Sequence, residues 1–277
     1  MQLYDCHCHS NHSRDSKVSV REIAENAVKL GFSGVTVTDH YNPLAANEPP
    51  ERQTCDPTNC EQSFEDILAV REQYRGQIDL LCGVEIGSCF RHADSCARLL
   101  HNEYVDEVIG SVHGIKPIFN NGEERGHSPF LDYPTEPDRL VEAYLCDVFR
   151  NAVFCDVDVI GHVTYLQRYI IKDGKVLFNV KKFIDACGDI MHAAISRSKA
   201  IEINAKSIQM CRDVPFTELE FFKMYRSMGG ELVTIGSDAH TLADFAYAET
   251  ARDILEAAGF RHACYYKKRQ AQFYSIV

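Results

Sequence analysis

The stretch Gly34-Val35-Thr36-Val37-Thr38-Asp39-His40 decides how the rest of the sequence is interpreted. Its first five residues are rich in β-branched side chains and predict a buried strand, and polar residues follow where that strand ends. On its N-terminal side, residues 20–30 have a helical pattern, with Ser19 and Glu22 placed as a capping box. A second helical pattern covers residues 63–74. A strand between two helices predicts β/α units, whose strands pair in parallel.

The same alternation recurs along the whole chain. We expect seven strands, at residues 3–6, 34–38, 78–84, 107–112, 157–161, 200–204 and 231–235. Further helices are expected at residues 137–154, 180–195, 216–228 and 241–258. Strands that alternate with helices predict a parallel sheet, and closing that sheet on itself gives an α/β fold, a distorted seven-stranded (β/α) barrel of the TIM-like kind. We expect residues 1–277 to form one domain.

An open, doubly wound sheet is the competing architecture. Neither Gly-x-Gly-x-x-Gly nor a P-loop motif follows any expected strand, so the nucleotide-binding version of that architecture loses support.

Composition narrows the functional classes. The chain has 277 residues, of which 45% are hydrophobic and 25% charged, as in an ordinary globular protein. Its formal net charge of −11 disfavours a broad nucleic-acid surface. Neither a signal peptide nor a run of roughly 20 apolar residues is visible, so we expect no membrane association. Twelve cysteines in such a chain favour free thiols and the cytoplasm. These features do not decide whether the protein forms a homo-oligomer.

Histidines and carboxylates gather at the expected strand ends. Six of the seven strands end in such residues, namely His7, His9, His40, Glu85, His113, His162, Asp238 and His240. Because strand side chains alternate between faces, His7 and His9 share one face. The carboxyl ends of parallel barrel strands converge on one mouth, so we expect these side chains to meet there.

So many imidazoles and carboxylates in one small volume would repel one another unless cations organise them. Imidazole and carboxylate ligands suit zinc, iron or manganese. The candidates outnumber the three or four ligands of a single zinc site, which predicts two or three divalent metals.

Any one histidine at a strand end is more often a structural or surface residue, and only the joint pattern favours metal binding. We interpret the histidines in helical or terminal stretches as structural: His92, His101, His192 and His262. His12 stays undecided, because it lies in the same loop as Asp15.

These motifs also occur together in a known family. They are His7-Cys8-His9, Thr38-Asp39-His40, Gly83-Val84-Glu85, Ser111-Val112-His113, Gly161-His162 and Gly236-Ser237-Asp238-Ala239-His240. With them the chain resembles the polymerase and histidinol phosphatase (PHP) family, and within it the stand-alone histidinol-phosphatase-like branch. The motifs span residues 7–240 in family order, so the resemblance covers essentially one whole domain.

The resemblance implies a trinuclear metal cluster. The first metal would be held by His7, His9, Glu85 and Asp238. Glu85 would bridge to a second metal, held also by His113 and His162. The third would be held by Asp15, His40 and His240. Some relatives have histidine at the position of Asp15, so His12 is an alternative to Asp15 as a ligand of the third metal.

The resemblance further implies hydrolysis of a small-molecule phosphomonoester, in this branch L-histidinol phosphate to L-histidinol and phosphate, a step of histidine biosynthesis. A hydroxide that bridges two metals would attack phosphorus. The catalytic residues would be Glu85, Asp238 and His240. Asp39 and Asn204 are candidates to orient the imidazoles through hydrogen bonds.

Phosphate recognition favours arginine, whose fork of donors matches two phosphate oxygens. Arg168 stands where related phosphatases tend to carry such an arginine. The branch often has a second arginine shortly after a Glu-Ile-Asn stretch, but residues 202–209 contain none. Lys206 is the expected substitute, with Arg212 as an alternative. This departure weakens the case for histidinol phosphate more than the case for phosphoester hydrolysis.

Three other functions stay open. The first is a phosphodiesterase, nuclease or nucleotide phosphatase of the same family. The second is a protein that binds the metals without catalysis, although the apparently complete ligand set argues against it. The third is a metal-dependent amide hydrolase, which is weakened because no lysine suited to carbamylation ends an expected strand.

Overall fold

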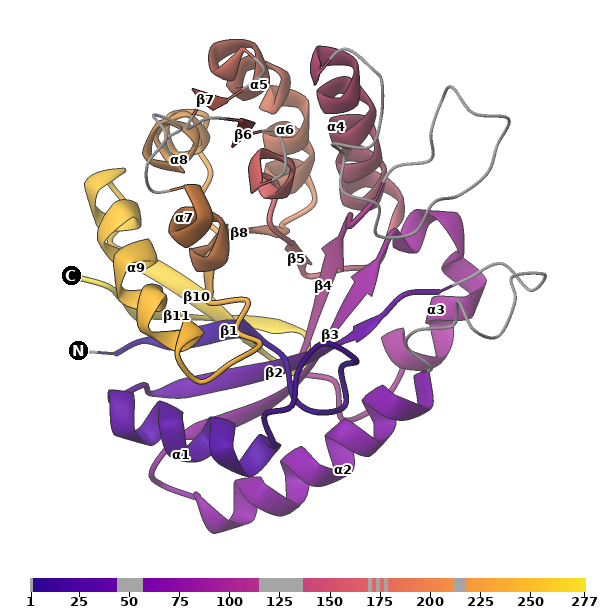
Figure 1. The fold of residues 1–277 in the computed structure, drawn as a ribbon, viewed down its shortest axis with the longest axis vertical. Coiled ribbons are helices and arrows are strands. Elements are labelled where there is room, and N and C mark those ends of the chain that lie inside the picture. Colours follow the sequence, from indigo (N-terminus) through magenta and orange to yellow (C-terminus); the bar gives the residue numbers. More distant parts are fainter. Residues whose placement is uncertain are drawn as a thin grey trace.

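Seven parallel strands form the central sheet of the protein (Figure 1). The computed structural model describes residues 2–43, 57–114, 137–168, 171–172, 175–176, 179–211 and 218–277. The strands lie in chain order: β1 (Tyr4–Cys8), β2 (Gly34–Tyr41), β3 (Asp79–Gly87), β4 (Glu107–Ser111), β5 (Val159–Ile160), β8 (Ala200–Asn204) and β9 (Val233–Gly236). All seven overlap strands expected from the sequence.

The sheet closes between its first and last strands. Cys8 and Ala239 form a parallel bridge, and the His9 N–H donates to the Ala239 carbonyl at 2.9 Å. The Asp238 N–H donates to the His7 carbonyl at 2.7 Å. The prediction of a distorted seven-stranded barrel is therefore confirmed, and the open-sheet alternative is wrong. Part of the distortion is the length of β5, which has only two residues.

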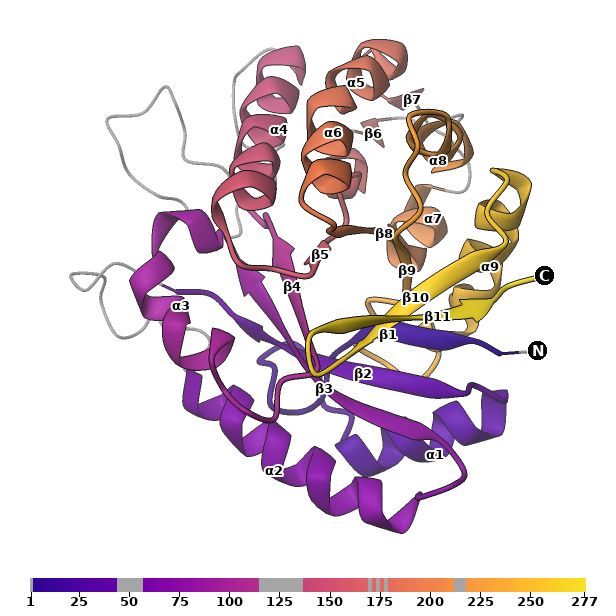
Figure 2. The same ribbon diagram turned by 180° about the vertical axis from the view of Figure 1, so that it is seen from behind.

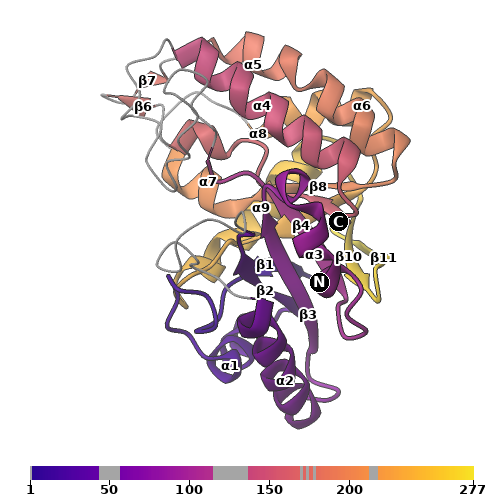
Figure 3. The same ribbon diagram turned by 90° about the vertical axis from the view of Figure 1, so that its right-hand side faces the viewer.

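Helices surround the barrel (Figure 3). The α-helices are α1 (Val20–Leu30), α2 (Pro57–Gln73), α3 (Ala93–Leu100), α4 (Pro137–Phe154), α5 (Val180–Ala186), α6 (Gly188–Ser196), α7 (Ala205–Cys211), α8 (Glu218–Ser227) and α9 (Ala248–Ala257). Short 3₁₀ turns are η2 (Cys89–Arg91), η4 (Tyr165–Arg168) and η5 (Asp244–Tyr247). Within the described parts of the chain, no helix combines the length and apolar character needed to cross a bilayer.

Helix α1 has the bounds and the cap that the sequence predicts. The Ser19 side chain accepts from the Glu22 N–H, and the Glu22 carboxylate accepts from the Ser19 N–H at 2.8 Å. Gly31 ends the helix with φ 76°, a left-handed conformation that glycine adopts without steric cost.

Three expected helices differ from the prediction, and the first is α2, which begins at Pro57 rather than at residue 63. Residues 180–195 form two helices, α5 and α6, because the chain turns at Cys187 and Gly188, and glycine is a weak helix former. The expected helix at 241–258 begins as the 3₁₀ turn η5. There the Asp244 carboxylate accepts from the Thr241 N–H at 3.1 Å and delays the regular helix α9 until Ala248.

A C-terminal hairpin, which the sequence did not predict, lies at the N-terminal ends of the barrel strands (Figure 2). It consists of β10 (His262–Lys267) and β11 (Gln270–Ser275), paired antiparallel. The Tyr274 hydroxyl donates to the carbonyl of Tyr4, the first residue of β1, at 3.4 Å. The Cys264 thiol donates to the carbonyl of Val233, the first residue of β9, at 3.3 Å. A second hairpin pairs β6 (Ile171–Lys172) with β7 (Lys175–Val176).

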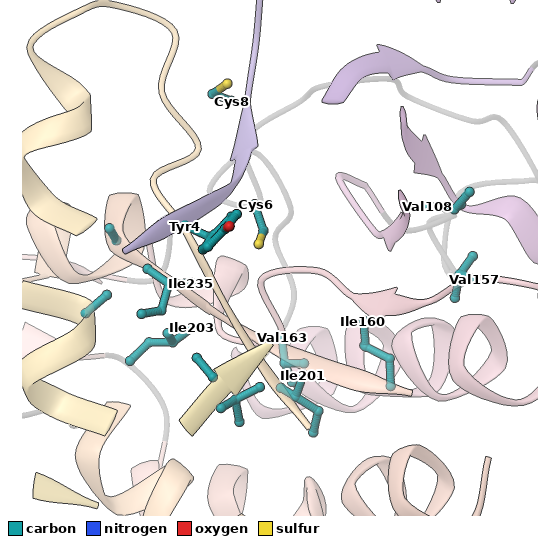
Figure 4. Packing of buried hydrophobic residues seen from close by; sticks show 14 of the residues in the cluster. Tyr4, Cys6, Cys8, Val108, Val157, Ile160, Val163, Ile201, Ile203 and Ile235 are labelled. Carbon is teal, nitrogen blue, oxygen red and sulfur yellow. The ribbon is translucent and has the colours of Figure 1, made fainter. Parts of the chain in front are cut away.

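Apolar side chains from neighbouring strands form the main core, among them Ile160, Ile203 and Ile235 (Figure 4). Other strand positions carry buried polar side chains instead. Asp5 and Glu107 lie at the lower, N-terminal part of their strands, and Glu202 and Asn204 lie at the upper end of β8. The upper ends of the strands therefore present polar groups that the apolar core does not use.

Candidate metal centre

The structure brings the strand-end histidines and carboxylates together. His7 is in β1 and His9 follows it, His40 is in β2, and Glu85 is in β3. The remaining residues follow β4, β5 and β9, and they are His113, His162, Asp238 and His240. The imidazole centroids of His9 and His40 are 4.0 Å apart, and those of His113 and His162 are 5.0 Å apart. The side chains thus form one continuous cluster.

One group within the cluster centres on the two imidazoles of β1. The Nε2 atoms of His7 and His9 are 3.1 Å apart. Oε2 of Glu85 lies 3.5 Å from His7 Nε2 and 3.7 Å from His9 Nε2, and Oδ1 of Asp238 lies 3.5 Å from His9 Nε2. These are the four residues that the family resemblance assigns to a first metal.

Glu85 also belongs to a second group. Its Oε1 lies 2.9 Å from Nε2 of both His113 and His162, and those two nitrogens are 3.2 Å apart. A single carboxylate therefore faces both groups, one oxygen toward each, as a bridging ligand would.

The third group contains Asp15. Its Oδ2 lies 3.3 Å from Nε2 of His240 and 3.5 Å from Nε2 of His40. His12 is placed elsewhere, since its Nε2 pairs with Oδ2 of Asp66 at 2.8 Å. Asp15, rather than His12, therefore faces the two imidazoles.

The hydrogen bonds of the first group leave two lone pairs facing each other. Nδ1 of His7 donates to the Glu202 carboxylate at 2.6 Å, so in the neutral ring the lone pair is on Nε2. Ser13 gives its hydroxyl hydrogen to Asp39 at 2.6 Å and must accept from Nδ1 of His9 at 3.3 Å. When both rings are neutral, two lone pairs 3.1 Å apart repel each other, and a cation between them, a proton or a metal, converts that repulsion into attraction. The donor set, imidazole nitrogen and carboxylate oxygen, fits zinc, iron or manganese.

The charges of the buried groups agree with this assignment. Burial raises the pKa of Glu85, but His113 and His40 hold it well below its usual range. Burial likewise raises the pKa of Asp238, and Arg168 brings it well below its usual value. Burial, followed by the neighbouring His40, lowers the pKa of His9 well below its usual value. Charged carboxylates beside a neutral imidazole are the protonation states that metal binding requires.

His7 shows the opposite shift. Burial lowers its pKa, but the carboxylates of Glu202, Glu85 and Asp238 together raise it well above the usual value. A site that draws a proton this strongly attracts any small cation placed at the same atom, so the metal and the proton compete for His7 Nε2.

Two predicted ligands have left-handed backbones, His162 with φ 22° and Asp238 with φ 55°. Such conformations cost a non-glycine residue about 1–3 kcal/mol and concentrate at functional sites. A hydrogen bond from the Asp238 N–H to the His7 carbonyl, at 2.7 Å, holds the second of these turns.

The Asp39 carboxylate reaches a predicted imidazole ligand through Ser13, whose hydroxyl lies 3.3 Å from Nδ1 of His9. The carboxylate accepts from the hydroxyls of Ser10, Ser13 and Ser63, each at 2.6 Å. It therefore fixes the loop that carries Asp15 and, through Ser13, the tautomer of His9.

Asn204 does contact a predicted ligand, as expected, although that ligand is a carboxylate. Its amide donates to Oδ2 of Asp238 at 3.3 Å and to Oε1 of Glu202 at 3.2 Å.

Arg168 lies beside the first group. Its guanidinium donates to Oδ2 of Asp238 at 2.9 Å, to Asn204 at 2.5 Å and to Ser207 at 2.9 Å, and it lies 4.8 Å from the ring centroid of Tyr165. Lys206 is farther out and pairs with Asp244 at 2.8 Å. Arg212 lies outside the described residues.

The sequence analysis did not single out Glu202. It is fully buried, accepts from the His7 ring at 2.6 Å, and accepts from the His162 N–H at 2.6 Å. The available signal was its alternation with Asn204, because residues two apart at the end of a strand share one face. The sixth strand therefore also delivers a carboxylate to the cluster.

The fold and the site define a class: a parallel (β/α) barrel whose mouth carries groups of histidines and carboxylates that could hold a metal ion. Comparison with known families identifies which barrel this is. The PHP domain model matches residues 5–206, and the chain belongs to that family.

Relatives of known name are similar over nearly the whole chain. The histidinol-phosphatase of Lactococcus lactis is 27% identical over 273 residues, covering 94% of this chain and 93% of its own. That of Bacillus subtilis is 22% identical, covering 91% and 98%. The crystal structure of the Lactococcus lactis histidinol phosphate phosphatase, complexed with zinc, L-histidinol and phosphate, superposes with a TM-score of 0.81. That superposition covers 98% of this chain and 100% of the other at 20% identity, and shows the same fold.

Proposed function

We propose that this protein is a metal-dependent phosphatase that hydrolyses a small-molecule phosphomonoester, with L-histidinol phosphate as the first substrate to test. The observation that carries the proposal is Glu85, whose two oxygens face two separate groups of imidazoles at the barrel mouth. The names of the relatives support the substrate, since both are histidinol-phosphatases.

The three groups of side chains would hold two or three divalent metals. Zinc is the first candidate, because the related crystal structure contains it, and iron and manganese suit the same ligands. When bound, such ions lower the pKa of water, polarise phosphoryl oxygens and neutralise charge that develops in the transition state.

The protein's own residues would position the phosphate. Asp238 turns Oδ1 toward His9 and Oδ2 toward Arg168, so one carboxylate links the metal side of the site to the cationic side. Asn204 and Ser207 fix the Arg168 guanidinium before substrate arrives. A preset guanidinium binds phosphate oxygens with little loss of side-chain entropy. We therefore assign phosphate binding to Arg168.

Lys206 is the weaker part of this assignment. Its ammonium is paired with Asp244, whose carboxylate also accepts from the His240 N–H at 3.3 Å. To contact phosphate it would have to leave that partner. For this reason the phosphomonoester class is the broader proposal, and histidinol phosphate is the specific one within it.

The test is phosphate release by the purified, metal-loaded protein from four substrates: histidinol phosphate, a nucleoside monophosphate, phosphotyrosine and a phosphodiester. We expect turnover of a monoester, and a loss of at least about 100-fold in His113→Ala, more than outer hydrogen-bond partners usually cost. The control is His192→Ala, an exposed helical histidine, which should keep wild-type rates. Turnover of the diester alone would favour the nuclease alternative. Full metal content without any hydrolysis would favour a non-catalytic protein.

We also propose that the protein acts in the cytoplasm. Every cysteine in the described residues is a free thiol, as a reducing compartment allows.

A further inference from the structure

Glu202 connects two predicted metal ligands that belong to different groups. Its Oε1 lies 2.6 Å from Nδ1 of His7, and its Oε2 accepts from the backbone N–H of His162 at 2.6 Å. We propose that Glu202 is a positioning residue that sets the tautomer of His7 and the backbone turn of His162, and thereby the metal affinity of both groups. The inference rests on the proposed metal-dependent function.

The first part concerns the His7 ring. An ionised carboxylate has only acceptors, so the atom that faces it must carry the ring proton. Nδ1 of His7 is that atom, which leaves the Nε2 lone pair directed at His9, Glu85 and Asp238. The opposite tautomer would place a proton where the metal should bind. Partners of this kind fix ring orientation and raise the basicity of the ligand.

The second part concerns the turn at His162. With φ 22°, this residue has a backbone that side chains other than glycine rarely adopt. The hydrogen bond from its N–H to Glu202 Oε2 is buried and offsets part of that strain. The turn directs the His162 ring toward Glu85, whose Oε1 is 2.9 Å from His162 Nε2.

The surroundings hold the Glu202 side chain in place. A Cβ at Gly236 would lie 2.0 Å from Glu202 Oε1 and 2.6 Å from His7 Cβ, so only glycine at that position leaves room for the pair. The Asn204 amide supplies a further donor to Oε1 at 3.2 Å. The carboxylate thus receives donors on both oxygens.

This donor arrangement explains why an amide cannot replace the carboxylate. In Glu202→Gln, one side-chain atom keeps accepting and the other becomes an NH₂ donor. If the NH₂ faces His7, the ring proton moves to Nε2 and blocks the metal. If it faces the His162 N–H, two donors collide and the turn shifts. Either orientation damages one of the two metal groups.

A matched control is available lower in the same barrel. Glu107 is also fully buried, and its Oε2 accepts from the Thr36 hydroxyl at 3.3 Å. In the β3–β4 register it pairs with Gly83, two residues before Glu85 in β3. Among the described residues, it forms no hydrogen bond with a predicted metal ligand. Burial raises the pKa of Glu107 well above its usual value, so Glu107→Gln replaces a buried, neutral carboxyl with an amide. It therefore controls for the loss of a buried carboxyl group in the barrel without touching the proposed positioning role.

The experiment measures zinc retention of wild type, Glu202→Gln, Glu202→Asp and Glu107→Gln in competition with a chromophoric chelator, with circular dichroism to establish that each is folded. We expect Glu202→Gln to lose about 10–100-fold in zinc affinity, Glu202→Asp to recover part of it, and Glu107→Gln to stay within about twofold of wild type. Long-range ¹H–¹⁵N spectra of zinc-loaded protein should show one histidine losing its Nδ1–H, Nε2-bound pattern in Glu202→Gln.

Two results would overturn the inference: wild-type zinc affinity in folded Glu202→Gln, or an equal loss in Glu107→Gln. The proposed function fails separately, if zinc-loaded wild type hydrolyses no phosphomonoester, and the zinc measurements still test Glu202 in that case. A wild-type protein that retains no metal would overturn both.

Discussion

At the scale of single residues, the groups that contact a buried carboxyl group determine whether it is ionised. Glu85 has five imidazoles within 4 Å of its oxygens, and its pKa stays well below the usual value despite complete burial. Glu218, at the start of α8, accepts from the Thr164 hydroxyl at 2.6 Å and the Gln167 amide at 3.0 Å, and burial raises its pKa to about 7 despite these donors. The two residues have the same side chain and opposite electrostatic states.

Glu218 should therefore make the stability depend on pH. Its pKa is higher folded than unfolded, so its contribution is complete below about pH 4.5 and is lost as the pH rises through 7. Glu218→Gln keeps an acceptor for both partners without a charge. Between pH 5 and 8, we expect the unfolding free energy of wild type to fall by about 1–3 kcal/mol more than that of the variant.

Urea unfolding at several pH values measures this difference. Glu220→Gln, two residues along α8 and exposed, is the control and should follow wild type. Parallel curves for wild type and Glu218→Gln would show that Glu218 is not the titrating group.

The sequence could predict the residues of the cluster but not what fixes their protonation. Strand ends with histidine and carboxylate can be found from spacing, because the parallel fold brings all such ends to one mouth. The partners of their rings come from distant segments, as Glu202 of β8 does for His7 of β1. Which oxygen faces which nitrogen depends on side-chain positions that no periodicity encodes.

At the scale of elements, the strands were easier to predict than the segments that cover the barrel. Buried strands can be recognised from runs of β-branched residues, and helix α1 can be recognised from its capping box. The hairpin of β10 and β11 was missed because its burial is irregular: in β11 only Tyr274 is fully buried, while Phe273 is largely exposed. Such a strand lacks the alternation that identifies one.

Tyr274 should carry much of the hairpin's contribution to stability. It is 4% exposed, its ring centroid lies 5.1 Å from that of Tyr4, and its hydroxyl donates to the Tyr4 carbonyl. Tyr274→Ala leaves a cavity beneath β1 and should cost about 3–5 kcal/mol in the free energy of unfolding. Denaturant titration measures this cost.

The neighbouring Phe273→Ala is the matched control. Phe273 is 59% exposed, so its removal should change stability by no more than about 0.5 kcal/mol. If both variants lost the same stability, the hairpin would not act through Tyr274.

For the molecule as a whole, the candidate metal centre lies where the first and last strands of the barrel meet. His7 and His9 come from β1 and its end, and Asp238 and His240 follow β9. A metal that joins these residues ties the two edges of the sheet together. Metal binding and barrel closure should therefore depend on each other.

Removing metal should lower the melting temperature of the protein. A ligand that binds only the folded state stabilises it by about 2.7 kcal/mol at a hundredfold excess over Kd. For a chain of this size each kcal/mol corresponds to about 2–4 °C. We expect a chelator to lower the melting temperature by several degrees and added zinc to restore it. Scanning calorimetry measures both changes, and an unchanged melting temperature would contradict a metal centre that joins the strands.

The contacts of the C-terminal hairpin have a consequence for how the chain is made. The Tyr274 hydroxyl bonds to the Tyr4 carbonyl across 270 residues, and the Cys6 thiol bonds to the Cys264 carbonyl across 258. During translation β1 leaves the ribosome before the hairpin that covers it has been synthesised. Nascent chains fold from the N-terminus onward, and contacts between distant residues form slowly. The lower end of β1, with Tyr4 and Cys6, is therefore uncovered while the residues between it and the hairpin are synthesised, which makes the growing chain a substrate for chaperones.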